Sequence, residues 1–440
     1  MLFHNPNFLF IFLPIVFVIY FFLKDKKKRI FFLSLSGFIF YAAWNLKFAP
    51  LIIGSIITNY LLGKKIILTN DAPKKKSILL LAIFFNIFYL AFFKYSDFFI
   101  SNYNIVFNTN VELLNFPFPL ALSFVTFQTI GFIYDCYEKN IKTLNLNKYS
   151  LFIIFFPQLI AGPIVKYHSM TSQFESDRKS IMNIKNVIIG LIVLSIGIIK
   201  KVFIADNLSI ISDQVFAAPE SLNFITSWIG SLCFTFQIYF DFSGYIDMAT
   251  GVALLFNIYL PQNFNSPYKA TGIIDFWQRW HITLTNFLTT YIYTPLLKSF
   301  KNLNFFKSMV STMLVFLIAG LWHGPSWLFV IFGALHGAGL ITNHVFRRFF
   351  SLSLNKFFSQ VITFLYVNFT FIFFRSESIS NSLYIIKKMF MFDSFNPLGG
   401  ISIEFTFYSI IAFIVSIFIC FLFKNTNWLI KKLEVSNILN

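Results

Sequence analysis

The stretch VSTMLVFLIAGLWHGPSWLFVIFGALHGAGL, residues 310–340, decides the fold class of this chain. It holds two apolar runs, Val310–Trp322 and Trp327–Leu340, which are separated only by the residues HGPS. An apolar run of about 15–20 residues can cross a bilayer as a helix, because a helix satisfies its own backbone hydrogen bonds. Pro325 disfavours helical geometry at the residue before it, so we expect the first helix to end immediately after His323.

Comparable apolar runs recur along the whole chain. With 57% hydrophobic and 12% charged residues and a mean hydropathy of +0.70, the sequence lies outside the range of soluble globular proteins. The runs predict an all-α polytopic membrane protein with roughly ten to twelve crossings, some short enough for tilted or re-entrant segments. The simplest organisation is one integral domain over residues 1–440. The other runs are Phe8–Leu23, Ile30–Trp44, Ile78–Phe93, Val187–Ile199, Phe224–Phe240, Val361–Phe374 and Phe405–Phe423.

The positive charge of the chain follows from its membrane topology. The net charge is +17, and basic residues concentrate in KDKKKR (24–29) and GKKIILTNDAPKKK (63–76). Short basic loops stay on the cytoplasmic side, so two crossings between these clusters place the N-terminus outside. The first run has no basic segment before it and no small-residue cleavage site after it, so it is interpreted as a retained helix. Nucleic-acid binding is not expected.

Motifs for metals, disulfides and nucleotides are missing from the sequence. Cys136, Cys233 and Cys420 are isolated, which predicts apolar packing residues and no disulfide framework. The sequence has no H-E-x-x-H motif and no close cluster of histidine and cysteine, so no metal site is expected. A Walker motif is also missing, which argues against ATP-driven transport.

Polar residues interrupt the apolar pattern between Phe240 and Phe300, most clearly in FWQRWHITLTNF, residues 276–287. If this segment is a helix, Trp277, Trp280, His281 and Leu284 share one face, and Asp275 can pair with Arg279 one turn later. Polar groups at membrane depth are tolerated against protein or a water-filled cavity, which favours a re-entrant catalytic lining. The alternative is an interfacial anchor in which His281 is only hydrogen-bonded.

Judged from its sequence context alone, His323 is the strongest candidate for a catalytic residue. An ionisable residue inside a membrane indicates function by default, and a neutral imidazole is a suitable general base near pH 7. The alternative is a structural histidine bound to a carbonyl. His336 lies among small residues that allow close helix packing, which favours a structural role. The remaining histidines, His4, His168 and His344, are expected to be solvated.

Six long motifs extend in one order from the N-terminus to about residue 379. They are NPNFLFIFLPIVFVIYF near the N-terminus, PLALSFVTFQTIGFIYDCY (119–137), FFPQLIAGPIVKY (155–167), YFDFSGYIDMATGVALLFNIYLPQNFNSPYKATGIIDFWQRWHITLTNFL (239–288), GLWHGPSWLFVIFGALHG (320–337) and FIFFRSESI. The most specific fall within residues 119–340. Together they resemble the membrane-bound O-acyltransferase family, in its bacterial branch of alginate and peptidoglycan O-acetyltransferase membrane subunits.

The resemblance implies a fold and a set of site residues. Its catalytic histidine, in a W-H-G context, matches His323 after Trp322, and its R-W-H motif matches Arg279, Trp280 and His281. The implied fold is a ring of helices around a central tunnel, with His323 near the narrow point. Asp241, Ser243 and Tyr245, together with Asp247, would line the tunnel or serve structural hydrogen bonds. Two positions depart from the pattern: Gln278 stands where Arg is usual, and Ile246 where Ser is usual.

The resemblance also implies a reaction. An acetyl group from a cytoplasmic donor, acetyl-CoA, would cross the bacterial cytoplasmic membrane, with no bound cofactor, for O-acetylation of a cell-envelope glycan. A separate extracytoplasmic acyltransferase would be the partner that completes the transfer. Peptidoglycan is the favoured acceptor, and alginate-type exopolysaccharide and D-alanyl transfer to teichoic acid are the alternatives. From another class, a lipid-linked glycan transporter would use the histidines as proton relays, although the sequence shows no two related halves.

Overall fold

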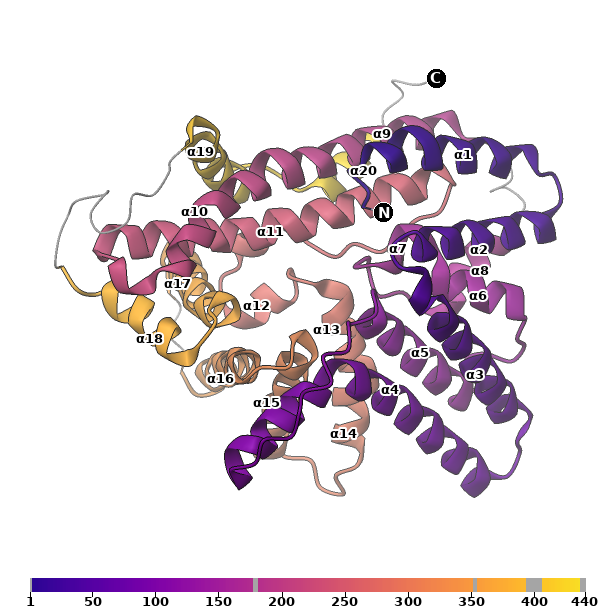
Figure 1. Ribbon diagram of the computed structural model, residues 1–440, viewed down its shortest axis with the longest axis horizontal. Coiled ribbons are helices and arrows are strands. Elements are labelled where there is room, and N and C mark those ends of the chain that lie inside the picture. Colours follow the sequence, from indigo (N-terminus) through magenta and orange to yellow (C-terminus); the bar gives the residue numbers. More distant parts are fainter. Residues whose placement is uncertain (1, 177–180, 351–353, 393–405, 436–440) are drawn as a thin grey trace. The chain divides into compact units, whose positions relative to one another are not determined.

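The computed structural model describes residues 2–176, 181–350, 354–392 and 406–435, and within these ranges every regular element is helical. Their packing divides into two compact units. Unit 1 holds residues 1–194 and 248–261, and unit 2 holds nearly all of 195–247 and 262–440, so helices α9 (Ile184–Ile198) and α11 (Phe224–Leu255) each contribute to both. Figure 1 labels these elements. One integral domain over the chain stays a prediction.

Unit 1 contains the N-terminal helices. Within it α3 and α4 both pack on α5, and α2 packs on α6. The elements are η1 (Phe8–Phe12), α1 (Leu13–Phe22), α2 (Lys26–Ala42), η2 (Leu46–Phe48), α3 (Ala49–Leu68), α4 (Ala72–Phe107), α5 (Leu122–Tyr137), α6 (Leu146–Ile154), α7 (Phe156–Leu159) and α8 (Tyr167–Glu175).

Unit 2 contains both motifs that the sequence singled out. Its elements are η4 (Ile199–Ala205), α10 (Asp206–Ala217), η5 (Pro219–Ser221), η6 (Pro267–Lys269), α12 (Ile273–Trp277), α13 (Ile282–Leu288), η7 (Thr289–Tyr293), α14 (Thr294–Lys298), α15 (Phe305–His323), α16 (Trp327–Phe349), α17 (Lys356–Arg375), α18 (Ile379–Lys388), α19 (Phe407–Phe421) and α20 (Thr426–Val435).

The described residues include six helices that are long and apolar enough to cross a membrane, or seven if the bent pair α19 and α20 forms one span. This number is lower than the roughly ten to twelve crossings expected, because several apolar runs fall on short or interrupted helices. Residues 8–22 are divided between η1 and α1, and α2 has 17 residues. The run that begins at Phe405 has its first residue outside the described ranges.

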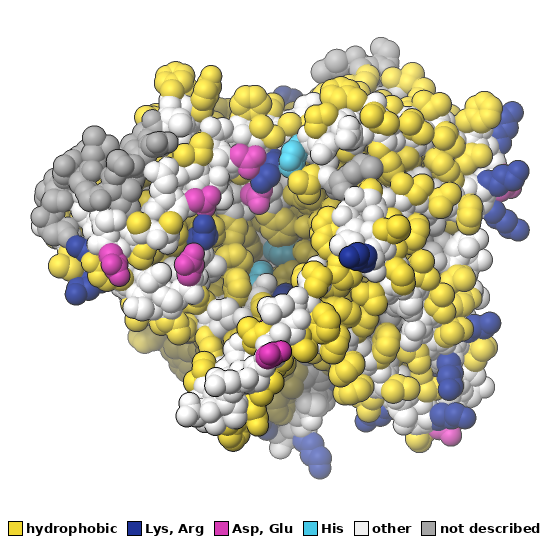
Figure 2. Space-filling view, viewed as in Figure 1, with side chains coloured by type: hydrophobic (Ala, Val, Ile, Leu, Met, Phe, Trp, Pro, Cys, Tyr) yellow, Lys and Arg dark blue, Asp and Glu magenta, His cyan; other side chains and the backbone are white. Residues whose placement is uncertain are grey.

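The surface supports the membrane assignment. Large apolar side chains such as Phe10, Phe22 and Phe84 are mostly exposed, and Figure 2 shows hydrophobic side chains over much of one face. Apolar surface on this scale is characteristic of a protein that contacts another apolar phase. The chain is therefore a multi-pass α-helical membrane protein, as the sequence predicts.

Candidate active site

Helix α15 ends at His323, as the sequence predicts. Gly324 is extended, with φ −174° and ψ 162°, and α16 begins at Trp327 after Ser326 accepts a hydrogen bond from the amide of Leu328. A Cβ on Gly324 would lie 2.2 Å from the ring of Phe329, so a larger residue here would require that ring to move. The turn therefore holds the imidazole of His323 at the end of a long apolar helix.

Close packing of α15 on α16 fixes the direction in which His323 leaves the helix. A Cβ on Gly320 would lie 2.3 Å from the carbonyl oxygen of Phe329, and a Cβ on Gly333 would lie 2.3 Å from that of Phe316. Only glycine at these two positions lets the two backbones come so near. The two helices therefore meet most closely within one turn of the histidine.

Aromatic rings surround His323, whose side chain is partly buried. Its ring centroid lies 5.2 Å from that of Phe374, 5.7 Å from that of Phe332 and 5.0 Å from that of Trp322. These rings exclude water from one side of the imidazole and keep it from being fully hydrated.

The segment 276–287 is not one helix, which corrects the sequence-based prediction. Helix α12 ends at Trp277, α13 begins at Ile282, and His281 adopts a left-handed conformation with φ 44° and ψ 52°. Hydrogen bonds to a neighbouring segment impose the break: the amide of Ile282 donates to Asn263 O, and the amide of Asn265 donates to Arg279 O, both at 2.9 Å. Tertiary pairing therefore overrides the helical spacing of the apolar residues.

The structure does not support the interfacial-anchor alternative for this segment. Trp277, Trp280 and His281 are exposed by only 4%, 5% and 1%, which places them in the interior of unit 2. The ring of Trp280 stacks on that of Phe276 at 5.7 Å. The segment is consequently a buried loop that presents His281 to the interior.

Asn263 fixes the tautomer of His281. Its Oδ1 accepts hydrogen bonds from the amide of Thr283 at 3.1 Å and from the hydroxyl of Thr283 at 2.9 Å. A backbone amide can only donate, so this atom is the amide oxygen and His281 Nδ1, at 3.2 Å, must carry the hydrogen. The lone pair of the neutral ring is therefore on Nε2.

His281 and His323 both lie near the indole of Trp322. The ring of Trp322 is 6.2 Å from that of His281 and 5.0 Å from that of His323. His281 lies in a loop outside the candidate spans, and burial lowers its pKa well below the usual 6.5, with a further decrease from nearby His323. His281 is thus neutral at physiological pH.

The other residues that the sequence singled out have different surroundings. The Arg279 guanidinium pairs with Asp275 at 2.7 Å, as predicted, and also contacts the carbonyl of Asn265 at 3.3 Å. It therefore holds the loop around Trp280 and His281. On α11, half-exposed Asp241 pairs with Lys201 at 2.6 Å, Ser243 is buried, and Tyr245 is partly buried.

Sequence reasoning missed two residues that contact His281. Phe242, which lies between Asp241 and Ser243, meets the imidazole edge to face at 4.8 Å. Asn263 stands in the LPQNFNSPY segment, 18 positions before the histidine whose tautomer it sets. The two asparagines of NFN, which lie between two prolines, were a signal of a polar loop. No spacing within the sequence, however, relates Asn263 to His281.

His336 has the structural surroundings that the sequence favours. It is fully buried, its Nδ1 accepts from the indole of Trp277 at 3.2 Å, and its Nε2 lies 3.0 Å from the hydroxyl of Thr370. Since Trp277 can only donate, Nε2 carries the hydrogen and donates to Thr370, which in turn donates to Val367 O. Both ring nitrogens therefore serve to connect α12, α16 and α17.

Comparison with known proteins adds the family. Residues 135–386 match the model of the membrane-bound O-acyltransferase family. Peptidoglycan O-acetyltransferase from Helicobacter pylori is 41% identical over 422 residues, which cover 88% of this chain and 80% of that protein. Probable alginate O-acetylase AlgI from Azotobacter vinelandii is 33% identical over 401 residues, covering 89% and 78%.

A more distant match is a teichoic acid D-alanyltransferase from Streptococcus thermophilus, which is 27% identical over 252 residues, covering 55% of this chain and 60% of that protein. The family model covers more than half of the chain and includes both histidine motifs. The two O-acetylating relatives extend over nearly all of it. The chain therefore belongs to the membrane-bound O-acyltransferase family and is a multi-pass membrane acyltransferase.

Proposed function

We propose that this acyltransferase moves an acetyl group from cytoplasmic acetyl-CoA across the bacterial cytoplasmic membrane for O-acetylation of peptidoglycan. The observation that carries the proposal is the 41% identity, over 88% of the chain, to a peptidoglycan O-acetyltransferase. An extracytoplasmic acyltransferase would be the partner that places the group on the polymer. The basic segments at 24–29 and 63–76 would favour the approach of a phosphate-bearing donor from the cytoplasm.

The transfer requires a base for an acceptor hydroxyl, and His323 is our candidate. In the proposed step the imidazole takes the hydroxyl proton, the oxygen forms a bond to the thioester carbonyl carbon, and the carbon–sulfur bond breaks. The departing thiolate then receives the proton from the imidazolium. Because neighbouring His281 is neutral, His323 can carry this proton without a second positive charge beside it. General acid–base catalysis of this kind contributes about 10²–10⁴-fold in rate.

His281 is proposed to orient the reacting group. Its Nδ1 hydrogen is engaged by Asn263, so Nε2 is the nitrogen that can accept a hydrogen bond from the acceptor hydroxyl. Trp322, whose indole lies near both imidazoles, would help to position them. Arg279 and Trp280 would keep the loop in place, and Asp241, Ser243 and Tyr245 remain proposed lining residues on α11.

An exopolysaccharide is the second candidate acceptor, because the probable alginate O-acetylase is 33% identical over 89% of the chain. Both candidate polymers would receive the acetyl group in the same way, as an ester of a sugar hydroxyl. They differ in which polymer loses acetate when the protein is inactive, so one experiment can separate them.

The test measures base-labile acetate on purified peptidoglycan and, separately, on exopolysaccharide. A deletion strain would carry the wild-type protein, His323→Ala, or His168→Ala, which changes an exposed histidine outside the site. We expect peptidoglycan acetate to be lost only with His323→Ala, at equal protein level in the membrane. If peptidoglycan acetate is unchanged and acetate is lost from the exopolysaccharide, the acceptor is the exopolysaccharide. Unchanged acetate on both would contradict the proposed role of His323.

A further inference from the structure

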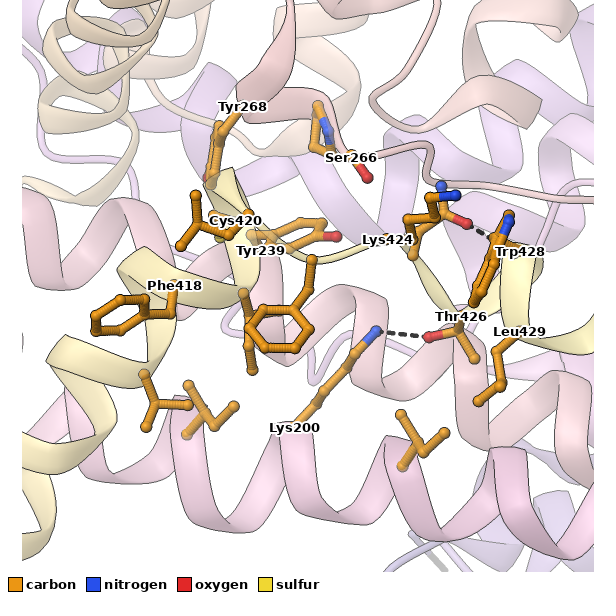
Figure 3. Close-up of a pocket in the computed structure, with 18 of the residues that line it drawn as sticks. Lys200, Tyr239, Ser266, Tyr268, Phe418, Cys420, Lys424, Thr426, Trp428 and Leu429 are labelled. Carbon is orange, nitrogen blue, oxygen red and sulfur yellow. Dashed lines mark hydrogen bonds between the residues drawn. The ribbon is translucent and has the colours of Figure 1, made fainter.

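A cavity of about 930 Å³ lies in unit 2, and neither His281 nor His323 is among its described lining residues (Figure 3). It is lined by residues of α9 and η4, of η6, and of the bent pair α19 and α20. Its volume is near the upper end of the range for sites that hold small molecules. The mechanism proposed above makes no use of it, and the inference below is independent of that mechanism.

The walls of the cavity are almost entirely apolar. Its floor contains the buried side chains of Ile204, Tyr239, Tyr268 and Cys420, and the hydroxyl of Tyr268 is engaged by the carbonyl of Thr235. Around its rim stand exposed apolar side chains, including Ile199, Phe418, Leu422 and Phe423. An apolar cavity with an apolar rim on a membrane protein opens toward hydrocarbon and suits an alkyl chain.

One end of the cavity is positively charged. Lys424 and Trp428 line this end, and the ammonium of exposed Lys424 lies 4.4 Å from the ring centroid of Trp428. Exposed Lys432 is not among the described lining residues, but its ammonium lies 5.2 Å from the same centroid. Aspartate and glutamate do not occur among the described lining residues. Lys200 donates to Thr426 at 3.0 Å (Figure 3). It also pairs with Asp247 at 2.6 Å, so its charge is compensated.

The break between α19 and α20 is built around this cavity. The two helices are bent by 61°, and all four residues between them, 422–425, line the cavity. Non-helical backbone at membrane depth is tolerated where its polar groups are satisfied or where it lines a cavity. Here Lys269 donates to the carbonyl of Phe423 at 2.6 Å, and the side chain of Asn425 donates to that of Asn265 at 2.7 Å. The bend thus places the basic end of the cavity beside the apolar rim.

We propose that the cavity binds an anionic phospholipid, with an acyl chain along its apolar walls and the phosphate beside Lys424 and Lys432. Basic pockets between membrane helices bind anionic headgroups, and each nearby lysine strengthens the attraction. A zwitterionic lipid has the same chains but no net charge, so it binds less tightly. Free phosphate has the charge but no chain for the apolar walls, so it does not compete.

The test titrates delipidated full-length protein with dioleoyl phosphatidylglycerol or dioleoyl phosphatidylcholine and counts bound lipids by native mass spectrometry. We expect the wild type to prefer the anionic lipid, and Lys424→Glu to weaken its binding by about tenfold, because one substitution reverses one charge near the phosphate. Lys424→Arg keeps the charge and should bind as the wild type does. Lys301→Glu makes the same reversal at an exposed position outside the cavity and should also bind normally.

A second variant tests the apolar walls. Val415→Trp fills part of the cavity without changing charge and should lower binding of both lipids, with folding checked by helical circular dichroism and gel filtration. Glycerol phosphate, which lacks acyl chains, should leave the bound phosphatidylglycerol in place. Three results would each overturn the proposal. They are equal affinity of the wild type for the two lipids, unchanged phosphatidylglycerol binding in Lys424→Glu, and a loss of that binding in Lys301→Glu as large as in Lys424→Glu.

Discussion

At the scale of single residues, the site depends on the protonation of His281. Its Nδ1 hydrogen is directed to Asn263 Oδ1, an atom that also accepts two hydrogen bonds from Thr283. Burial keeps the ring neutral. A neutral acceptor such as an amide preserves this state, whereas a carboxylate at the same place would favour the imidazolium.

Asn263→Asp should therefore raise the pKa of His281 and make His281 charged beside His323. We expect the acid limb of the pH–activity profile to move to higher pH, with lower transfer near pH 7, because a charged neighbour hinders proton uptake by His323. The measurement is the pH dependence of acetyl transfer by the purified protein. Asn265→Asp introduces the same charge at an exposed position two residues away and should leave the profile unchanged. A profile identical in both variants would contradict the assigned tautomer network.

The same histidine links stability to pH. Its pKa is depressed in the folded protein, so between that value and about 6.5 the unfolded chain binds more protons. The contribution of neutral His281 to the free energy of unfolding is fully present above about pH 6.5. It is lost as pH falls, by up to about 1.4 kcal/mol per pH unit for a single titrating group. We expect the thermal midpoint in detergent to fall between pH 7.5 and 5, and to fall less in His281→Gln, which cannot titrate there. Parallel curves would show that His281 is not held neutral.

At the scale of elements, sequence reasoning succeeded where the cause is local. Pro325 and Gly324 end α15 at His323, and Asp275 and Arg279 pair one helical turn apart. It failed where a distant segment decides the conformation. The amides of Asn265 and Ile282 pair with carbonyls across the two segments and break the helix before His281, and no spacing within residues 276–287 reveals this. The bend at 422–425 escaped prediction for the same reason, since its anchors are Lys269 and Asn265.

The contact between α15 and α16 gives a prediction at this scale. Gly320→Ala would bring a methyl group within 2.3 Å of the carbonyl oxygen of Phe329, on the backbone of the facing helix. We expect the free energy of unfolding to fall by about 1–3 kcal/mol, because the two helices must separate to admit the methyl group. In Gly54→Ala, on α3, the added methyl group meets no atom within 4 Å, so helix propensity should give a gain of about 0.5–1 kcal/mol.

Thermal unfolding followed by fluorescence-detected gel filtration measures both glycine variants in the same detergent. The two midpoints should move in opposite directions from that of the wild type. Acetyl transfer should also fall in Gly320→Ala, since His323 lies three residues beyond the substitution on the same helix. Equal midpoints for Gly320→Ala and the wild type would show that α15 and α16 are not packed backbone to backbone at Gly320.

At the scale of the whole molecule, the transfer that we propose is vectorial, so the orientation of the chain in the bilayer decides which side would supply the donor. The basic residues at 24–29 precede and begin α2, and those at 63–76 end α3 and begin α4. If residues 8–22, α2 and α3 each cross once, both basic clusters lie on the cytoplasmic side and the N-terminus lies outside. This arrangement presents the positive charge to the compartment where acetyl-CoA is made.

Cysteine labelling tests this orientation directly. Lys27→Cys and Lys74→Cys are exposed positions in the two basic clusters, and Asn5→Cys is an exposed position before η1. In intact spheroplasts a membrane-impermeant maleimide should label Asn5→Cys alone, and all three should react once the membrane is opened with detergent. The native thiols of Cys136, Cys233 and Cys420 are buried, so the unmodified protein should give a low background. Labelling of Lys27→Cys in intact spheroplasts would reverse the orientation and place the basic clusters on the side away from the donor. The role proposed for the basic loops would then be lost.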